Sequence, residues 1–335
     1  MSVLVLYTGG TIGMKSSAQG FVPMEDFEGF FRDKIAEKAN IIVPEFDFVS
    51  LDSLIDSANL VPANWTFIGE KLLSLWHNYD AFVVLHGTDT MAYTASALSF
   101  MFQGLDKPVI ITGSQLPLSQ KYNDAYENVT KSLRLAAYAG LKEVCICFNG
   151  RVLRGNRSTK VKSAELDAFN SPNYPWLGTI NTEVSLQSHL LLTPSTPHYL
   201  VPEFDCDAVL ILQIFPGISA LAFEGIFNQN CFKAIIIKTY GMGNSPNFDS
   251  PLMSIIERAL AQGIIVLNIT QCLIGGVNQE TYSTGNHMKE LGVIAGKDMT
   301  VEAAFSKLHF LIASGKSTNE IKQLLIQDLA GEMTA

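Results

Sequence analysis

Residues 3–13, VLVLYTGGTIG, join a short apolar run to a glycine-rich turn. The run from Val3 to Tyr7 predicts a buried strand, and the adjacent Gly9 and Gly10 allow the backbone to turn sharply and approach a ligand closely. A dinucleotide-binding loop would need the pattern G-x-G-x-x-G and an acidic residue about 20 positions later, and this stretch lacks the full pattern. The setting of Thr11 instead favours a nucleophile held exposed at the end of a strand.

Similar apolar runs recur along the chain and alternate with longer amphipathic segments. The pattern predicts further strands at 82–85, 109–111, 144–148, 208–214, 234–238 and 264–268, and helices at 63–77, 91–102, 124–139, 249–262 and 301–313. Buried strands that alternate with helices indicate an α/β fold whose largely parallel sheet is covered by helices on both faces.

The length of the chain indicates two domains, because 335 residues exceed the size at which a single hydrophobic core usually stops growing. The polar, proline-punctuated stretch 181–202 interrupts the alternation and is typical of a linker. We therefore predict a larger N-terminal α/β domain over residues 1–185, a linker over 186–205 and a smaller C-terminal α/β domain over 206–335.

The composition argues against several classes of protein. A net charge of -9 without a basic patch disfavours binding to nucleic acid or to an anionic membrane surface. The N-terminal run is too short for a secretory signal, and no apolar stretch is long enough to span a bilayer. The five cysteines are scattered, with Cys145 and Cys147 on one face of a predicted strand, so we expect a cytoplasmic protein without a disulfide framework or a metal site. With 47% hydrophobic and 16% charged residues, we also expect surface to be buried in an oligomer.

A second segment, LHGTDTM at residues 85–91, also follows a predicted strand and leads into a helix. Its backbone N–H groups and the positive end of the helix dipole lie beside Thr88 and Asp89. Thr88 or Asp89 could simply cap the helix, because such residues lead at N-caps. His86 could be a core residue whose ring nitrogens are both hydrogen-bonded.

A third segment, RVLRGNRSTK at residues 151–160, is dense in cations in a chain that is otherwise sparing with them. One interpretation is a solvated hairpin. The other is that Lys160 reaches into a cleft, where its ammonium holds a neighbouring hydroxyl ready for proton transfer.

Together these three segments, in this order and spacing, resemble the L-asparaginases, and the bacterial cytoplasmic type I enzymes in particular. The resemblance covers essentially the whole chain. It extends to IDS at 55–57, TGSQLP at 112–117, YGMGN at 240–244 and TQC at 270–272.

The resemblance implies an amidohydrolase that converts L-asparagine and water into L-aspartate and ammonia without a cofactor. Thr11 attacks the side-chain amide and forms a β-aspartyl ester, which water then hydrolyses. Thr88, Asp89 and Lys160 organise the proton transfers, with Lys160 polarising Thr88. A backbone N–H near Thr88 serves as an oxyanion donor.

The same resemblance implies how the substrate is held. Asp89 pairs with the ammonium group, while Ser57 and neighbouring backbone N–H groups take the carboxylate. The Ser114 carbonyl accepts a hydrogen bond from the leaving amide, and Asp56 and Gly87 are assigned to the substrate site. In this family a partner subunit completes the cleft, so we expect a homodimer or homotetramer. Asn244 is a candidate for the contribution of the partner.

Two positions depart from the family pattern. Phe21 stands where the family usually has a lid tyrosine, so the phenol is missing, and Tyr282 of a partner chain is our candidate to replace it. Lys238 stands where an arginine serves the allosteric site near Cys272, to which Thr159 is also assigned, and lysine cannot make the same two-pronged contact with a carboxylate. We therefore doubt that asparagine regulates this chain cooperatively.

Several alternatives remain open at the level of sequence. Glutamine is one methylene longer than asparagine, a difference worth only about 1–3 kcal/mol in a pocket, so a weak glutaminase side activity is left open. An amidase acting on charged transfer RNA is disfavoured by the acidic charge and by the missing RNA-binding domain. A non-catalytic amino-acid sensor with the same fold is the alternative from a different class. A nucleotide-dependent oxidoreductase lacks the glycine pattern that it needs.

Overall fold

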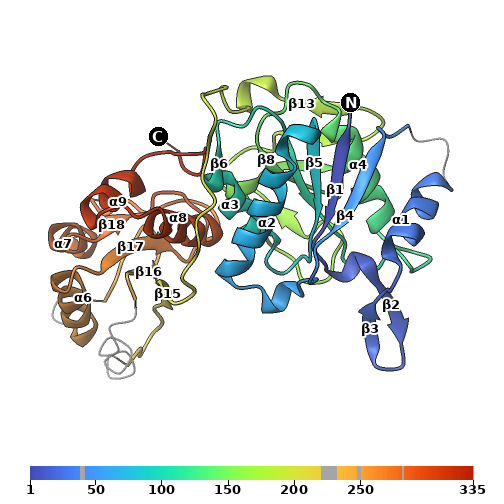
Figure 1. Ribbon diagram of the computed structural model, residues 1–335. Helices are drawn as coiled ribbons and strands as arrows, with labels where there is room; N and C mark the ends of the chain where they lie inside the picture. The colour runs from blue at the N-terminus through green and yellow to red at the C-terminus, as the bar shows by residue number, and fades with distance from the viewer. Residues whose placement is uncertain (38–41, 220–231, 247–249, 281–282, 335) are drawn as a thin grey trace. The chain divides into compact units, whose positions relative to one another are not determined.

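The computed structural model describes residues 1–335 except 38–41, 220–231, 247–249, 281–282 and 335 (Figure 1). The chain forms two compact units, residues 1–201 and 202–335. The unit boundary falls inside the segment predicted as a linker. Unit 1 extends to residue 201, beyond the predicted end of the first domain at 185, and takes in nearly all of the polar stretch 181–202. In this stretch β13 (Val184–Leu186) extends the main sheet, and β14 (His198–Tyr199) pairs with β6 (Phe102–Gln103).

Among the described residues, unit 1 is built around an eight-stranded sheet in the order β13-β12-β9-β8-β7-β5-β1-β4. The other strands of this sheet are β1 (Val3–Tyr7), β4 (Phe46–Ser50), β5 (Ala81–Leu85), β7 (Val109–Thr112), β8 (Val144–Phe148), β9 (Arg151–Arg154) and β12 (Gly178–Ile180). The strands from β8 to β4 are parallel, and those from β9 to β13 are antiparallel. The largely parallel sheet expected from the sequence is therefore confirmed for the half that carries β1.

Helices cover both faces of this sheet (Figure 1). They are α1 (Phe27–Ala36), α2 (Pro62–Ser74), α3 (Met91–Met101) and α4 (Ala125–Ala136). Val3, Val5 and Tyr7 pack with α1 and α4 in one core cluster, which also contains Cys145 and Cys147. Because successive side chains of a strand point to opposite faces, Leu4 and Leu6 face the other layer, and all five residues of β1 are buried.

Two hairpins of unit 1 lie outside the main sheet. β2 (Met14–Ser17) pairs with β3 (Gly20–Pro23), and β10 (Thr159–Lys160) pairs with β11 (Phe169–Asn170). The first hairpin begins directly after the turn that contains Thr11, and Figure 1 shows it extending away from the sheet.

Unit 2 has a four-stranded parallel sheet in the order β15-β16-β17-β18 within the described part of the chain. Its elements are β15 (Val209–Gln213), β16 (Ala234–Thr239), β17 (Ile265–Thr270), β18 (Ile294–Ala295), α6 (Pro251–Ala261), α7 (Ser283–Leu291), α8 (Val301–Ala313) and α9 (Thr318–Leu325). The apolar face of α6 packs on β15, β16 and β17 in one core. The predicted second α/β domain is confirmed. In neither unit does a described helix have the length and apolar character needed to cross a membrane.

Candidate functional site

The site lies where four neighbouring strands of unit 1 end in register. Tyr7 at the end of β1 pairs with Ser50 of β4 and with Leu85 of β5, and Leu85 pairs with Thr112 of β7. The loops that follow these strands therefore emerge side by side. They contain IDS, TGGTIG, HGTDT and GSQLP, the motifs singled out in the sequence, and ligands in open α/β sheets bind at this carboxyl edge.

Glycines let these loops touch backbone to backbone. A Cβ on Gly10 would lie 2.5 Å from the Gly87 Cα, and a Cβ on Gly87 would lie 2.4 Å from the Ser57 Oγ. Likewise, a Cβ on Gly113 would lie 2.2 Å from the His86 carbonyl oxygen. Gly10 also has φ of 93°, in the region that favours glycine. Any larger residue would force these loops apart, so the glycines set the spacing of the site.

Thr11 opens the one-turn helix η1 (Thr11–Gly13) directly after Gly10. Its side chain is partly exposed, and within the described ranges its hydroxyl makes no hydrogen bond. The Leu118 N–H donates to the Ile12 carbonyl at 3.1 Å and so ties the turn to the loop after β7. A fixed backbone with an uncommitted hydroxyl is the arrangement that a nucleophile needs.

Tyr7 supports this turn from the core. Its ring centroid lies 4.7 Å from that of Phe27, and its hydroxyl lies where a side chain on Gly13 would be. Burial raises the pKa of Tyr7 to about 12. This phenol therefore stays protonated at neutral pH, which suits a structural support and not a base.

Lys160 joins the loop after β5 although 72 positions separate it from Thr88. Its Nζ donates to the Thr88 Oγ1 and to the Asp89 Oδ1, each at 2.8 Å. The Lys160 side chain is 20% exposed and that of Asp89 is 59% exposed. The ammonium is thus largely sheltered from water, while the carboxylate beside it still has free surface for a ligand.

The two structural alternatives for these segments are wrong. The N-cap of α3 is Thr90, not Thr88 or Asp89, and the Thr90 hydroxyl donates to the Ser57 carbonyl at 2.9 Å. Thr88 and Asp89 are therefore not committed to capping. The cationic segment is not a solvated hairpin either, because Arg154 is buried against Glu143 with a 2.7 Å ion pair.

His86 is a core residue, as one interpretation of the sequence held. It is 1% exposed, its Nδ1 lies 2.7 Å from the Gly87 carbonyl oxygen, and its Nε2 lies 3.0 Å from the Thr94 Oγ1. Burial lowers the pKa of His86 to about 4. The neutral ring with a proton on Nδ1 satisfies both contacts, so His86 braces the loop and has no free nitrogen for proton transfer.

Gln115, to which no role was assigned from the sequence, contacts Thr88. The Thr88 hydroxyl donates to the Gln115 Oε1 at 3.2 Å, and the Gln115 Nε2 donates to the Ser163 and Glu165 carbonyls at 3.0 and 3.3 Å. The two carbonyls fix which end of the amide faces Thr88. Gln115 lies within the TGSQLP motif, but a neutral amide gives no acid–base signal in a sequence, so only its contacts reveal it.

The predicted substrate residues of unit 1 lie around the same loops. Ser57 is 5% exposed, and Asp56 caps the short helix η2 (Ser57–Asn59) by accepting from the Ala58 N–H at 3.2 Å. Ser114 is 2% exposed, and its hydroxyl has no hydrogen-bond partner among the described residues. The structure therefore brings Ser57, Gly87 and Ser114 to the loop cluster that holds Thr11.

The remaining predicted residues are distributed over both units. Asn244, Lys238 and Cys272 lie in unit 2: Asn244 in a bridge with Tyr240, Lys238 in β16 and Cys272 exposed after β17. Thr159 is buried in unit 1. Tyr282 falls outside the described residues. The allosteric and cross-subunit roles of these residues stay predictions.

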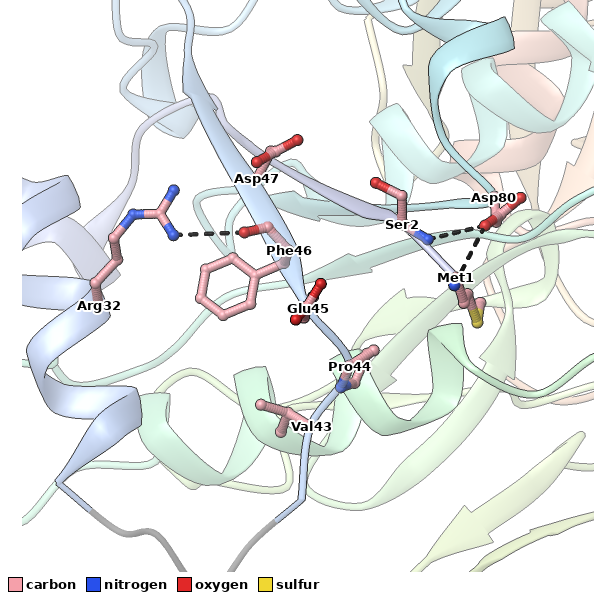
Figure 2. A pocket seen from close by; sticks show the side chains of 9 residues that line it. All are labelled: Met1, Ser2, Arg32, Val43, Pro44, Glu45, Phe46, Asp47 and Asp80. Atoms are coloured by element: carbon pink, nitrogen blue, oxygen red, sulfur yellow. Dashed lines mark hydrogen bonds and ion pairs between the residues drawn. The ribbon is translucent and has the colours of Figure 1, made fainter.

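Two pockets of unit 1 help to delimit the site. One of about 560 Å³ is lined by Leu51, Asp52, Ser53, Ile55 and one side of α2, beside the loop that carries Ser57. The other lies at the opposite, amino-terminal edge of the sheet, where Figure 2 shows Arg32 near Phe46 and the Met1 amine near Asp80. That second pocket is remote from Thr11 along β1. In the described ranges, no group of three or more His, Cys, Asp or Glu residues is placed to hold a metal ion.

Comparisons with known proteins agree with this geometry. The family model described as Asparaginase, N-terminal, matches residues 2–192, and the one described as Glutaminase/Asparaginase C-terminal domain matches residues 208–325. L-asparaginase 1 of Escherichia coli (strain K12) is 41% identical, with 99% of this chain and 98% of that protein covered. The structure of L-asparaginase I from Vibrio cholerae matches with a TM-score of 0.91 and 40% identity over 100% of this chain and 99% of the other. The thermostable L-asparaginase from Thermococcus kodakarensis matches with a TM-score of 0.88 and 31% identity over the full length of both chains.

Proposed function

The chain belongs to the asparaginase family and hydrolyses L-asparagine to L-aspartate and ammonia, and we propose that Thr11 is its nucleophile. Attack by the Thr11 hydroxyl on the side-chain amide gives a β-aspartyl ester and releases ammonia, and water then cleaves the ester. Two easier steps thereby replace one difficult step. The uncommitted hydroxyl of Thr11, on a turn held by Gly10 and Gly87, supports this role.

Two consecutive hydrogen bonds support a role for Lys160 in polarising and orienting the Thr88 hydroxyl. Lys160 donates to Thr88, and Thr88 donates to Gln115. Because the ammonium and the amide oxygen take one lone pair and the proton of the Thr88 hydroxyl, its second lone pair is left for the hydrogen of an incoming group. We propose that this lone pair accepts a hydrogen bond from the Thr11 hydroxyl and so orients the Thr11 oxygen for attack. As the oxygen–carbon bond forms and the carbon–nitrogen bond breaks, the Thr11 proton is transferred to the leaving nitrogen, which departs as ammonia.

Charge and exposure support the proposed binding of the substrate. Asp89 keeps 59% of its side chain exposed next to Lys160, so its second oxygen can pair with the substrate ammonium. We propose that Ser57, with Asp56 beside it, takes the α-carboxylate. The Gly87 and Thr88 segment supplies a backbone N–H to the oxyanion, a donor whose loss costs about 3–4 kcal/mol in other enzymes. The Ser114 carbonyl accepts from the leaving amide.

Assembly, regulation and location belong to the same proposal. We propose a homodimer or homotetramer in which Asn244 and Tyr282 of a partner chain complete the cleft. Lys238 replaces the arginine that the family uses at its allosteric site, to which Cys272 and Thr159 are also assigned. We therefore expect a hyperbolic and not a sigmoidal dependence of rate on asparagine. Among the described residues, Cys145 and Cys147 are buried on one face of β8, and Cys206 and Cys272 are exposed and free. We propose a reducing, cytoplasmic location, in which free thiols are the rule.

The observation that carries the mechanism is the pair of 2.8 Å contacts from the Lys160 Nζ to Thr88 and Asp89. The test is release of ammonia from asparagine by the wild type, Thr11→Ala and Lys160→Met, with Lys162→Met as the control. Lys162 is a neighbouring lysine that pairs with Asp167 and does not contact Thr88. We expect Thr11→Ala and Lys160→Met to lower kcat by about 10²-fold or more, and Lys162→Met to keep kcat within about twofold.

Each result separates one alternative. Full turnover by Thr11→Ala would contradict the assignment of the nucleophile. Saturable binding of asparagine by the wild type without release of ammonia would favour the amino-acid sensor. The same assay with glutamine measures any glutaminase side activity, which one methylene of extra length disfavours by only about 1–3 kcal/mol.

A further inference from the structure

Two buried polar residues at the start of α4, Asp124 and Asn128, make contacts that their own helix does not need. Asp124 is at the N-cap position, but its side chain makes no capping hydrogen bond to α4. It is 6% exposed, and Asn128, one turn later, is 1% exposed. Burying a carboxylate and an amide is costly unless each is hydrogen-bonded, so the partners of these side chains indicate what they are for.

Those partners are backbone groups in the turn formed by residues 113–116. The Asp124 carboxylate accepts from the Gln115 N–H at 3.0 Å and from the Leu116 N–H at 2.9 Å. The Asn128 Nδ2 donates to the Gly113 carbonyl at 3.0 Å and to the Asp124 Oδ2 at 3.1 Å. The two side chains therefore hold three backbone groups of one short turn and also hold each other.

The far side of Asn128 is fixed as well. Its Oδ1 accepts from the Asn149 N–H at 2.8 Å, and Asn149 has φ of 48° in the turn after β8. Asn128 thus links the end of β8 to the end of β7. A side chain held by three hydrogen bonds in the interior has little freedom to shift, which makes it a rigid support for the turn that it contacts.

The turn held in this way carries the side chain that orients Thr88. The Gln115 backbone N–H is bound by Asp124, and the Gln115 side chain lies between Thr88 and the 163–165 segment beyond Lys160. A small rotation of the Gln115 backbone would move its Oε1 out of reach of the Thr88 hydroxyl. A displacement of about 1 Å at a positioning group can cost about 10²-fold in rate.

We propose that Asp124 and Asn128 are positioning residues for the hydrolysis, acting through Gln115 on the Thr88 hydroxyl. The inference rests on the proposed role of Thr88. The two residues do not touch the reacting atoms. They fix the backbone of the turn at 113–116, and this turn fixes the Gln115 amide oxygen to which the Thr88 hydroxyl donates.

The test is a double-mutant cycle in kcat between Asp124→Asn and Gln115→Met in the full-length protein. Asparagine has nearly the same shape as aspartate. Its side-chain NH₂ group would, however, face one of the two backbone N–H donors that the Asp124 carboxylate accepts from, so one hydrogen bond would be lost. We expect Asp124→Asn to lower kcat by tenfold or more with KM changed less than threefold. If Asp124 acts through Gln115, the same substitution in the Gln115→Met background changes kcat less than threefold.

The matched control is Thr130→Val on the same helix. Thr130 is 1% exposed, and its hydroxyl bonds to the Tyr126 carbonyl of α4, away from the turn. We expect this variant to lower Tm while kcat stays within twofold. Should Asp124→Asn fail to fold, Asp124→Ser removes the charge without creating a clash of donors and takes its place in the cycle.

The outcomes separate the inference from the function on which it rests. The positioning role would be overturned if the loss of kcat in the double variant equalled the product of the losses in Asp124→Asn and Gln115→Met. It would also be overturned if Asp124→Asn left kcat unchanged. Both results would count against it even if Thr11→Ala is inactive. An unchanged kcat in Gln115→Met would overturn it too. Failure of the mechanism itself appears separately, as full activity in Thr11→Ala or Lys160→Met.

Discussion

At the scale of single residues, the site depends on small and neutral groups as much as on charged ones. Gly10 and Gly87 allow two loops to meet at backbone distance, and the neutral His86 braces one of these loops from within the core. Lys160 and Asp89 form their ion pair on loops whose backbone is already held by these glycine contacts and by His86. Preorganisation of this kind places a reactive hydroxyl before any substrate arrives.

Burial of His86 predicts a loss of stability in acid. Its pKa is about 4 in the folded protein against about 6.5 in an unfolded chain, so the unfolded state binds a proton first as pH falls. The contribution is fully present above pH 6.5 and is lost as pH falls toward 4, amounting to about 2 kcal/mol by pH 5. We expect Tm of the wild type to fall between pH 7 and pH 5, and less so in His86→Gln.

A control for the His86 prediction is His77→Gln, at an exposed position after α2. This variant should keep the pH dependence of the wild type. Equal pH dependence of Tm in the wild type and in His86→Gln would show that His86 is not the group responsible. His309 of unit 2, whose pKa is also lowered to about 4 by burial, would then be the next group to test.

At the scale of elements, strand ends and the loops after them decide what the site contains. β4, β1, β5 and β7 end in register, so four loops separated in sequence lie along one edge. The hairpin of β2 and β3 continues directly from the turn that holds Thr11. The loop after β7 also contacts this hairpin through two hydrogen bonds. The Ser119 hydroxyl donates to the Met14 carbonyl, and the Gln120 side-chain amide donates to the Ser16 hydroxyl.

The hairpin carries Phe21, the position at which the sequence is predicted to depart from the family pattern. Phe21 in β3 is 48% exposed and pairs in register with Ser16, so a hydroxyl can be added there without disturbing the core. We expect Phe21→Tyr to raise kcat/KM for asparagine at least threefold, because a phenol near the nucleophile can take part in proton transfer, an effect worth about 10²–10⁴-fold where it is complete. Steady-state rates of ammonia release measure the change.

Its complement is Tyr282→Phe, which tests whether a partner chain already supplies the phenol. An unchanged rate in Phe21→Tyr together with a reduced rate in Tyr282→Phe would assign the role to Tyr282. Unchanged rates in both variants would mean that this chain needs no phenol. Tm should stay within about 2 °C of the wild type in Phe21→Tyr, because surface substitutions usually change stability by less than about 0.5 kcal/mol.

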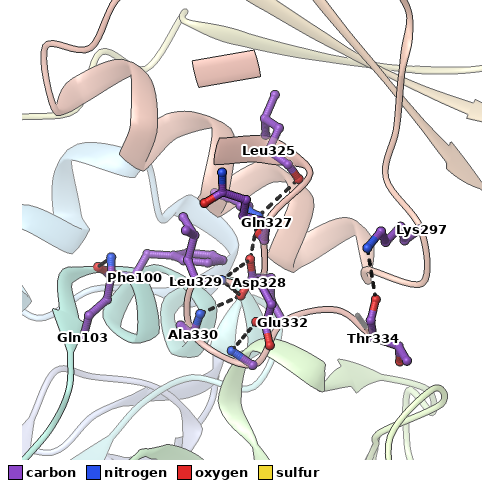
Figure 3. A network of polar contacts seen from close by, with 12 residues as sticks. Phe100, Gln103, Lys297, Leu325, Gln327, Asp328, Leu329, Ala330, Glu332 and Thr334 are labelled. Atoms are coloured by element: carbon purple, nitrogen blue, oxygen red, sulfur yellow. Dashed lines mark hydrogen bonds and ion pairs between the residues drawn. The ribbon is translucent and has the colours of Figure 1, made fainter. Parts of the chain in front are cut away.

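At the level of the whole molecule, each of the two units contains a buried ion pair, Arg154 with Glu143 in unit 1 and Lys307 with Glu332 in unit 2. In unit 2 a fully buried ion pair joins Lys307 of α8 to Glu332 near the C-terminus. Glu332 also accepts from the Leu329 and Ala330 N–H groups, and Figure 3 shows this turn with Asp328 beside it. Lys307 donates to the Leu325 and Gln327 carbonyls. The pair therefore holds the end of the chain on its own unit.

Breaking this pair should destabilise unit 2 selectively. Glu332→Gln leaves the Lys307 ammonium buried without its counter-charge, which typically costs about 3–5 kcal/mol. The pKa of Glu332 is lowered by Lys307 despite burial, in agreement with a charged pair at neutral pH. By calorimetry we expect a transition at lower temperature in Glu332→Gln than in the wild type. The double variant Lys307→Met with Glu332→Leu should regain part of the lost stability. If its loss of stability equalled the sum of the losses in Lys307→Met alone and Glu332→Leu alone, the pairing would be contradicted.

Much of the fold was predictable because it depends on local periodicity. The runs at 3–7 and 144–148 and the helix at 301–313 have the bounds that the apolar pattern indicates. The segment at 181–202 was harder to interpret. Its prolines and polar residues are typical of a linker, yet β13 extends a sheet and β14 pairs with β6, because edge strands tolerate such sequence where partner strands are available.

The strand-and-helix alternation, the glycine-rich turn that exposes Thr11 and the motif that contains Thr88 and Asp89 could all be predicted from the sequence, because each depends on residues within a few positions of one another. The resemblance implied that Lys160 polarises Thr88, and the fold supplies the 2.8 Å contact between them. The choice of Thr90 over Thr88 as the N-cap, and the contacts that Gln115 and Asp124 make beside Thr88, are visible in the tertiary structure alone. The physical reason is that hydrogen bonds across a sheet edge depend on which strands lie side by side. That order is set by packing of the whole unit and leaves no local signal in the chain.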